Sequence, residues 1–160
     1  MNDNDNHLPL FGVGPFLIIP ILVITVTSII LTVYNLVPVY KLNWDILNIL
    51  GVFLIILGII FWVMAALKSR IDDEIKSNRL VTTGVYGLVR HPIYAAFLYA
   101  VTGLILIANN IYLLVLPVIY WIILTIAMIK TEEKWLTDKF GKSYIEYSRK
   151  VSRFVPFLRI

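Results

Sequence analysis

Two short polar segments of this 160-residue chain hold the side chains best suited to chemistry. The first is Arg90-His91-Pro92-Ile93-Tyr94, which offers a cation, an imidazole and a phenol, and the second is Glu132-Glu133. A guanidinium binds anionic groups, whereas imidazoles and carboxylates bind ligands or transfer protons. If the fold brings the two segments together, they predict a polar binding or catalytic site.

Each of these residues also has an interpretation without a function. Arg90 can serve as a basic anchor at a membrane boundary, and His91 as a hydrogen-bonded bystander. Glu132 and Glu133 can be ordinary charges at the start of a helix. Tyrosines are common at membrane–water interfaces. Composition and spacing alone therefore indicate a membrane protein with a potential site at one face.

The composition of the chain requires lipid around it. Hydrophobic residues make up 59% and charged residues 15%, and the mean hydropathy is +0.85. Soluble domains average about 45–50% apolar and about 25% charged residues. A chain of this length cannot bury so much apolar surface in a water-facing fold, so the excess faces lipid. We expect an integral membrane protein with no nucleic-acid partner, because the basic residues flank apolar segments.

The chain has no cysteine, which excludes disulfides, thiolate metal ligands and a cysteine nucleophile. Only His7 and His91 remain as nitrogen ligands, so we expect no metal site.

Four apolar stretches predict an all-α, multi-pass transmembrane helical bundle with about four membrane segments. A crossing takes about 20 residues. The third stretch, Ile93–Ala108, is shorter than a full crossing requires. The Asn109-Asn110 turn joins the third and fourth stretches into a helical hairpin. We expect Pro117 to kink the last one. The stretches are residues 11–37, Trp44–Leu67, Ile93–Ala108 and Ile111–Ile129.

We expect a single integral membrane domain over residues 1–160. Residues 8–78 would hold the first two helices and a cytosolic extension of the second, over Lys68–Arg79. Residues 79–160 would hold the site, followed by amphipathic C-terminal helices.

The basic residues predict the orientation of the bundle. Lys41 is the one basic residue expected on the far side of four crossings, and all the others lie on the near side with the 68–92 loop and the 130–160 tail. Because positive charge favours the cytoplasmic side, that face is expected to be cytosolic.

The sequence of the tail predicts two short helices. The first starts near Thr131, which we expect to cap it, and ends at Gly141. The second covers about Lys142–Lys150 and places Tyr144 and Tyr147 on one face, which fits a helix on the membrane surface with aromatic rings at headgroup depth.

The topology allows the two chemical segments to meet. Pro92 suits the first turn of a helix, which places Arg90 and His91 at its positive end. One up-and-down hairpin separates them from Glu132-Glu133, so both segments return to the same face.

The local sequence is similar to a known family. Residues 81–94 resemble the T-x-G-x-Y-x-x-x-R-H-P-x-Y signature of the isoprenylcysteine carboxyl methyltransferase and phospholipid methyltransferase families. The tail resembles their E-E-x-x-L…F-G-x-x-Y-x-x-Y…V-x-R-F-x-P ending. Order and spacing match over residues 79–157, about half of the chain.

This resemblance implies methyl transfer from S-adenosylmethionine, with S-adenosylhomocysteine as product, to a lipophilic acceptor in the membrane. The cofactor would bind on the cytosolic side. Arg90 and Glu133 would act on the acceptor, with Arg153 as a further candidate to bind it. The residues implied to bind the cofactor are Gly84, through its backbone, Tyr86, His91, Tyr94, Glu132 and Glu133.

The acceptor type stays open at this point. An isoprenylcysteine-type carboxylate is nucleophilic at neutral pH and needs a cation such as Arg90 to position it. A phospholipid amine is protonated and needs a proton acceptor, for which Glu132 or Glu133 would serve. The oligomeric state is also open.

Two other functions fit parts of the pattern. Membrane sterol reductases, which bind NADPH, carry a similar motif and tail, and a non-enzymatic small membrane subunit would need no site. One position departs from the methyltransferase pattern, because Ala96 stands where the family usually has glycine.

Overall fold

The computed structural model describes residues 14–42, 45–68 and 80–157, and every regular element in these ranges is a helix. The prediction of an all-α fold is thus confirmed. The expected extension over residues 69–79 lies outside the described residues. The α-helices are α1 (Gly14–Val33), α2 (Asp45–Lys68), α4 (Pro92–Ala108), α5 (Val115–Lys130), α6 (Glu132–Phe140) and α7 (Lys142–Lys150), and the 3₁₀ turns are η3 (Gly84–Gly87) and η4 (Ile111–Leu114).

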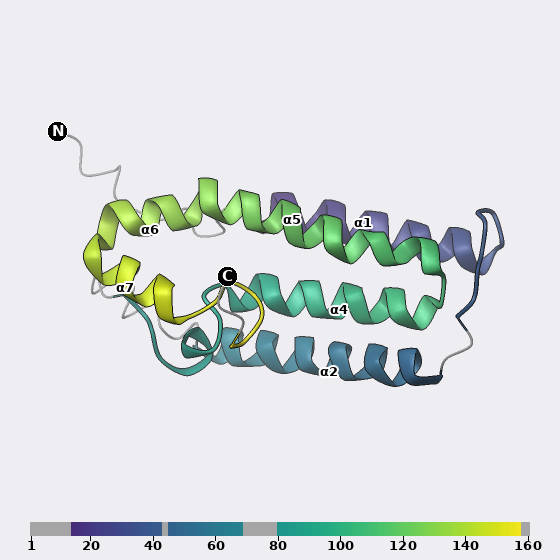
Figure 1. Ribbon diagram of the computed structural model, residues 1–160, viewed down its shortest axis with the longest axis horizontal. Helices are drawn as coiled ribbons and strands as arrows, with labels where there is room; N and C mark the ends of the chain where they lie inside the picture. The colour runs from purple at the N-terminus through teal and green to yellow at the C-terminus, as the bar shows by residue number, and fades with distance from the viewer. Residues whose placement is uncertain (1–13, 43–44, 69–79, 158–160) are drawn as a thin grey trace.

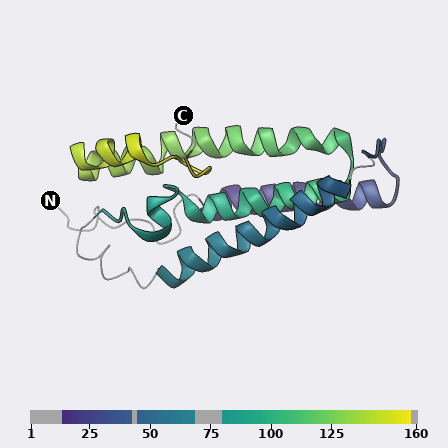
Figure 2. The same ribbon diagram turned by 60° about the horizontal axis from the view of Figure 1, so that its bottom comes forward.

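The long helices run beside one another in alternating directions, and the short helices α6 and α7 gather at one end (Figure 1). Figure 2 shows α5, α6 and α7 lying over a layer that contains α1, α2 and α4. At the α6–α7 end, the start of α1 meets the start of α4, where the Tyr94 hydroxyl lies 3.3 Å from the position of a Cβ on Gly14.

Within the described residues, three segments are long and apolar enough to cross a membrane, namely Gly14–Val33, Asp45–Leu67 and Ile111–Phe140. The remaining apolar helix, α4, has 17 residues and is as short as the sequence predicts. Large apolar side chains such as Phe53 and Ile122 are exposed on the helices, as expected for surfaces in contact with lipid.

Pro117 does not interrupt the last apolar segment in mid-helix. The 3₁₀ turn η4 ends at Leu114 and α5 begins at Val115, so Pro117 lies in the first turn of α5. Backbone N–H groups have no helical partner there, and proline costs little.

Glycines let α2 and α4 pack backbone to backbone. A Cβ on Gly103 would lie 2.4 Å from the carbonyl oxygen of Gly51, and one on Gly58 would lie 2.7 Å from that of Ala96. Small residues permit such close approach in membrane helices. The backbone of Ala96, a buried residue, therefore lies against a glycine of α2.

A polar cluster ties the loops together at the end opposite α6 and α7. Asn109 ends α4 with a φ of 50°, as the expected turn requires. The Asn110 side chain is buried; its Nδ2 donates to the Pro38 carbonyl (3.1 Å), and its Oδ1 accepts from the backbone N–H groups of Tyr40 (3.4 Å) and Tyr112 (3.3 Å).

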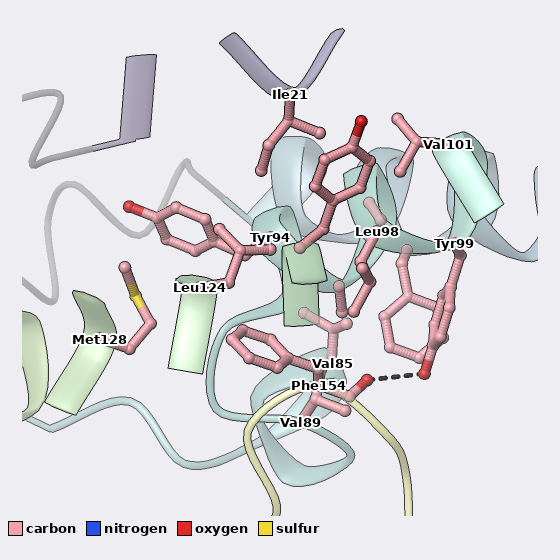
Figure 3. Packing of buried hydrophobic residues seen from close by; sticks show 14 of the residues in the cluster. Ile21, Val85, Val89, Tyr94, Leu98, Tyr99, Val101, Leu124, Met128 and Phe154 are labelled. Carbon is pink, nitrogen blue, oxygen red and sulfur yellow. Dashed lines mark hydrogen bonds between the residues drawn. The ribbon is translucent and has the colours of Figure 1, made fainter. Parts of the chain in front are cut away.

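Buried apolar side chains from α1, α2, the loop before α4, α4, α5 and the tail form the core beneath the polar end of the bundle. Figure 3 shows Val85 and Val89 of the loop, Leu98 of α4, Leu124 of α5 and Phe154 of the tail packed around one another. The Tyr99 hydroxyl donates to the Phe154 carbonyl at 2.6 Å. The tail is thus anchored in the core.

Candidate active site

The segment after α7 pairs with the loop that carries Arg90 and His91. We call residues 151–155 the C-terminal strap. The strap forms a parallel bridge between Ser152 and Val89. The N–H of Arg90 donates to the Ser152 carbonyl (2.8 Å), and that of His91 donates to the Arg153 carbonyl (3.1 Å). These bonds fix the backbone from which both side chains project.

His91 and Pro92 lie at the start of α4, as the sequence predicts. Pro92 is the first residue of the helix, and the His91 carbonyl accepts the first helical bond, from the N–H of Ala95 at 3.0 Å. Arg90 and His91 are therefore held at the positive end of α4.

Glu133 joins the two chemical segments. The buried carboxylate accepts from Arg153 at 2.8 Å (Nε to Oε1) and 3.0 Å (Nη2 to Oε2). Arg90 Nη1 lies 3.1 Å and His91 Nε2 3.3 Å from Oε1. The expected meeting of the segments is confirmed, and one carboxylate is surrounded by two guanidinium groups and an imidazole.

His91 also links Glu133 to Glu132. Its Nδ1 lies 3.3 Å from Glu132 Oε2, so both ring nitrogens face carboxylates. Burial opposes a charge on the imidazole, but hydrogen bonds and charges from Glu132 and Glu133 outweigh it and raise the pKa of His91. With both nitrogens occupied, His91 orients the two glutamates.

Glu132 is the more accessible of the two carboxylates. It accepts a 2.5 Å hydrogen bond from the Tyr94 hydroxyl, and its side chain is 27% exposed. Among the described residues, Glu132 has no ion pair with an arginine or lysine. It is therefore the carboxylate of the pair that no guanidinium group neutralises.

The loop before Arg90 lies close to this cluster. Gly84 begins η3 with a φ of 63°, a conformation that favours glycine. Burial, and then the charge of Glu132, raise the pKa of Tyr86. The Tyr147 hydroxyl donates to the Tyr86 carbonyl at 2.7 Å and holds η3 against α7.

The tail helices have the predicted bounds but differ in two details. α6 ends before Gly141, whose φ is 54°, and α7 covers Lys142–Lys150 as expected. Thr131 is the N-cap residue of α6, as expected, but its hydroxyl makes no capping hydrogen bond and donates back to the Ala127 carbonyl at 2.7 Å. Tyr144 and Tyr147 are buried within the protein, so the expected placement of their rings at headgroup depth is wrong.

A cavity of about 460 Å³ opens beside Glu133. This volume lies within the range of about 300–1,000 Å³ that is typical of small-molecule sites. The predicted acceptor residues Arg90, Glu133 and Arg153 line it, whereas His91, Tyr94 and Glu132 do not. The other lining residues, which the sequence did not single out for this role, are Thr137, Tyr144, Ser148, Arg149, Val151 and Ser152.

Comparison with known proteins identifies the family. The phospholipid methyltransferase family model matches residues 46–143. The chain belongs to this family. The matched region of this family member contains Arg90, His91 and both glutamates, and it ends before the C-terminal strap.

Relatives of this phospholipid methyltransferase family member include enzymes named for isoprenylcysteine. Protein-S-isoprenylcysteine O-methyltransferase B of Arabidopsis thaliana is 34% identical over 130 residues, which cover 76% of this chain and 64% of the relative. Protein-S-isoprenylcysteine O-methyltransferase A of the same plant is 33% identical over 137 residues, covering 80% and 68%.

A bacterial relative carries a different kind of name. The cobalt-zinc-cadmium resistance protein CzcN of Cupriavidus metallidurans is 31% identical over 114 residues, covering 71% of this chain and 50% of the relative. The chain thus spans between half and about two thirds of the length of these three proteins. No solved structure matches it.

Proposed function

We propose that this protein transfers a methyl group from S-adenosylmethionine to the carboxylate of a lipophilic acceptor dissolved in the membrane. The observation that carries the proposal is the ion-pair cluster at Glu133, which joins Arg90 and His91 to Arg153 beside a cavity. Membership of a methyltransferase family supports the reaction class.

The residues fit a cofactor with an ammonium group at its amino-acid end. Glu132 would hold the ammonium group, because it is partly exposed and not neutralised by a guanidinium group. Tyr94 and His91 keep its carboxylate in place. Tyr86 and the backbone of the Gly84 turn would complete this side. When bound, the cofactor supplies a methyl group on a positively charged sulfur.

The charges at the cavity favour a carboxylate acceptor over an amine. Glu133 is bound to two guanidinium groups and faces His91, so it is a poor acceptor for a proton from an ammonium group. A carboxylate requires no proton removal before a new C–O bond forms and the C–S bond breaks. Arg90 can position such an anion, since its Nε is buried and has no hydrogen-bond partner in the described structure.

The bundle allows the two reactants to arrive from different phases. The site lies at the α6–α7 end, where α6 and α7 carry exposed lysines such as Lys134 and Lys150, so we place it at the cytosolic surface. The apolar body of an acceptor would stay among the lipid-exposed helices. Residues 79–160 would form the catalytic core.

Cofactor binding tests the proposal directly. We expect calorimetric titration of S-adenosylhomocysteine into the full chain in detergent to show saturable binding. Glu132→Gln removes the charge that faces the ammonium group and should weaken binding at least about tenfold, because charge-assisted hydrogen bonds contribute about 1.5–3 kcal/mol. Glu146→Gln, an exposed glutamate of α7, is the matched control and should bind normally.

Turnover distinguishes the acceptors. With labelled S-adenosylmethionine, we expect a base-labile methyl ester on N-acetyl-S-farnesylcysteine, a carboxylate on an isoprenyl chain. If the label instead appears on phosphatidylethanolamine in vesicles, the acceptor is an amine and the proposed carboxylate acceptor is wrong. Binding of NADPH in place of S-adenosylhomocysteine would contradict methyl transfer and favour a reductase.

A further inference from the structure

Tyr144 of α7 is a buried cavity residue with an unused hydroxyl. Its side chain is 2% exposed and lines the cavity beside Glu133. The hydroxyl oxygen is buried and has no hydrogen-bond partner in the described part of the chain. Burying an unpaired hydroxyl costs free energy, so such a group calls for a ligand or a function.

The other buried tyrosines show that this is specific to Tyr144. Tyr94 donates to Glu132, Tyr99 to the Phe154 carbonyl and Tyr147 to the Tyr86 carbonyl. Tyr120 accepts a hydrogen bond from the Thr25 hydroxyl at 3.1 Å. Tyr144 and Tyr147 lie on the same short helix, and only one of them has a structural partner.

The charge of the cavity indicates what Tyr144 would bind. Arg90, Arg149 and Arg153 line it together with a single carboxylate, Glu133, so the wall carries more positive than negative charge. The Nε of Arg90 and the Tyr144 hydroxyl are both buried donors of this wall without an acceptor, and the Arg90 guanidinium is close enough to the phenol to oppose the rise of its pKa. Two such donors suit one anionic group.

We propose that Tyr144 binds the anionic head group of the methyl acceptor, by donating its hydroxyl hydrogen to a carboxylate oxygen that Arg90 also contacts. This inference rests on the proposed methyl transfer and adds a residue that selects for the acceptor. Burial raises the pKa of Tyr144 to about 12, so the hydroxyl keeps its proton at neutral pH.

The matched pair Tyr144→Phe and Tyr147→Phe tests the inference in the full chain in detergent. For Tyr144→Phe we expect thermal stability at or above wild type, unchanged affinity for S-adenosylhomocysteine, and a KM for N-acetyl-S-farnesylcysteine raised about tenfold or more. Tyr147→Phe loses its bond to the Tyr86 carbonyl and should lower stability with a smaller effect on that KM.

The outcomes separate this inference from the proposed function. Wild-type KM and kcat in Tyr144→Phe, with an active wild-type protein, would overturn the role of Tyr144 and leave methyl transfer standing. A raised KM together with a matching loss of S-adenosylhomocysteine affinity would also overturn it, because the defect would then be structural. A wild-type protein that binds no S-adenosylhomocysteine and methylates no acceptor would contradict the proposed function itself.

Discussion

Arg153 donates two parallel hydrogen bonds to Glu133, from Nε to Oε1 at 2.8 Å and from Nη2 to Oε2 at 3.0 Å. Arg153 lies in the C-terminal strap and Glu133 in the first turn of α6, so this pair joins the tail to the end of the last long helix. The same carboxylate faces Arg90 and His91 of the loop. Two-point contact fixes the orientation of both groups as well as their separation.

Arg153→Lys is expected to impair the site while the charge is retained. An ammonium group cannot reproduce the two parallel bonds, so Glu133 would be held less firmly. We expect kcat to fall at least about tenfold and the unfolding free energy to fall by about 1–3 kcal/mol, which thermal unfolding and a methyl-transfer assay would measure. Lys150→Ala, an exposed cation of α7, is the control; an equal loss there would show that the effect reflects surface charge.

His91 is expected to make the stability of the fold depend on pH. Its pKa is raised in the folded state above the ordinary value of 6.5, because its two nitrogens face Glu132 and Glu133. The stabilising contribution is therefore fully present below the unfolded pKa and is lost as pH rises through the folded pKa. Thermal unfolding at increasing pH should show this loss.

His91→Gln is the variant that tests this assignment. Glutamine keeps a hydrogen-bonding side chain but does not titrate, so the decrease of stability above pH 6.5 should be smaller than in wild type. An identical pH profile in both proteins would rule out His91 as the group responsible.

Gly103→Ala is expected to separate α2 from α4. The new methyl would lie 2.4 Å from the Gly51 carbonyl oxygen and 2.8 Å from Ile55 Cγ1, so the helices must shift. Overpacking of this kind costs about 1–3 kcal/mol. Leu104→Ala, at the neighbouring lipid-exposed position, should cost less, and the reverse order of thermal stabilities would contradict the packing described for these helices.

Asn110→Ala is expected to destabilise the end of the bundle far from the site. The change leaves the N–H groups of Tyr40 and Tyr112 and the carbonyl of Pro38 without their side-chain partner. We expect a loss of about 1–3 kcal/mol of stability and unchanged affinity for S-adenosylhomocysteine. A large loss of affinity in protein that is still folded would indicate coupling between the two ends.

Local sequence signals predicted the elements that carry the site. Pro92 indicated the start of α4 and Gly141 the boundary between α6 and α7, because both residues act on the backbone at their own position. Counting crossings then predicted that Arg90 and Glu133 meet. This step needed only the direction of the helices.

The features that the sequence did not predict depend on contacts between parts of the chain or on hydrogen bonds to the backbone. The spacing of Tyr144 and Tyr147 indicated one face of α7 but not whether that face meets lipid or protein. The pairing of the strap with Val89 has no periodic signal, since a single bridge is too short to produce one. Thr131 has the residue type of a cap, yet its hydroxyl already bonds to the preceding turn.

The pairing of the strap with the loop has a consequence for how the protein is made. Ser152 and Arg153 follow all of the described helices, so the ribosome adds them after α5 and α6 have been synthesised. Until then the nascent chain presents Glu133 without the arginine that binds it at two points. A chain interrupted before residue 151 would contain every described helix and still lack the arginine that pairs with Glu133, so the ion-pair cluster is the last part of this fold that synthesis can complete.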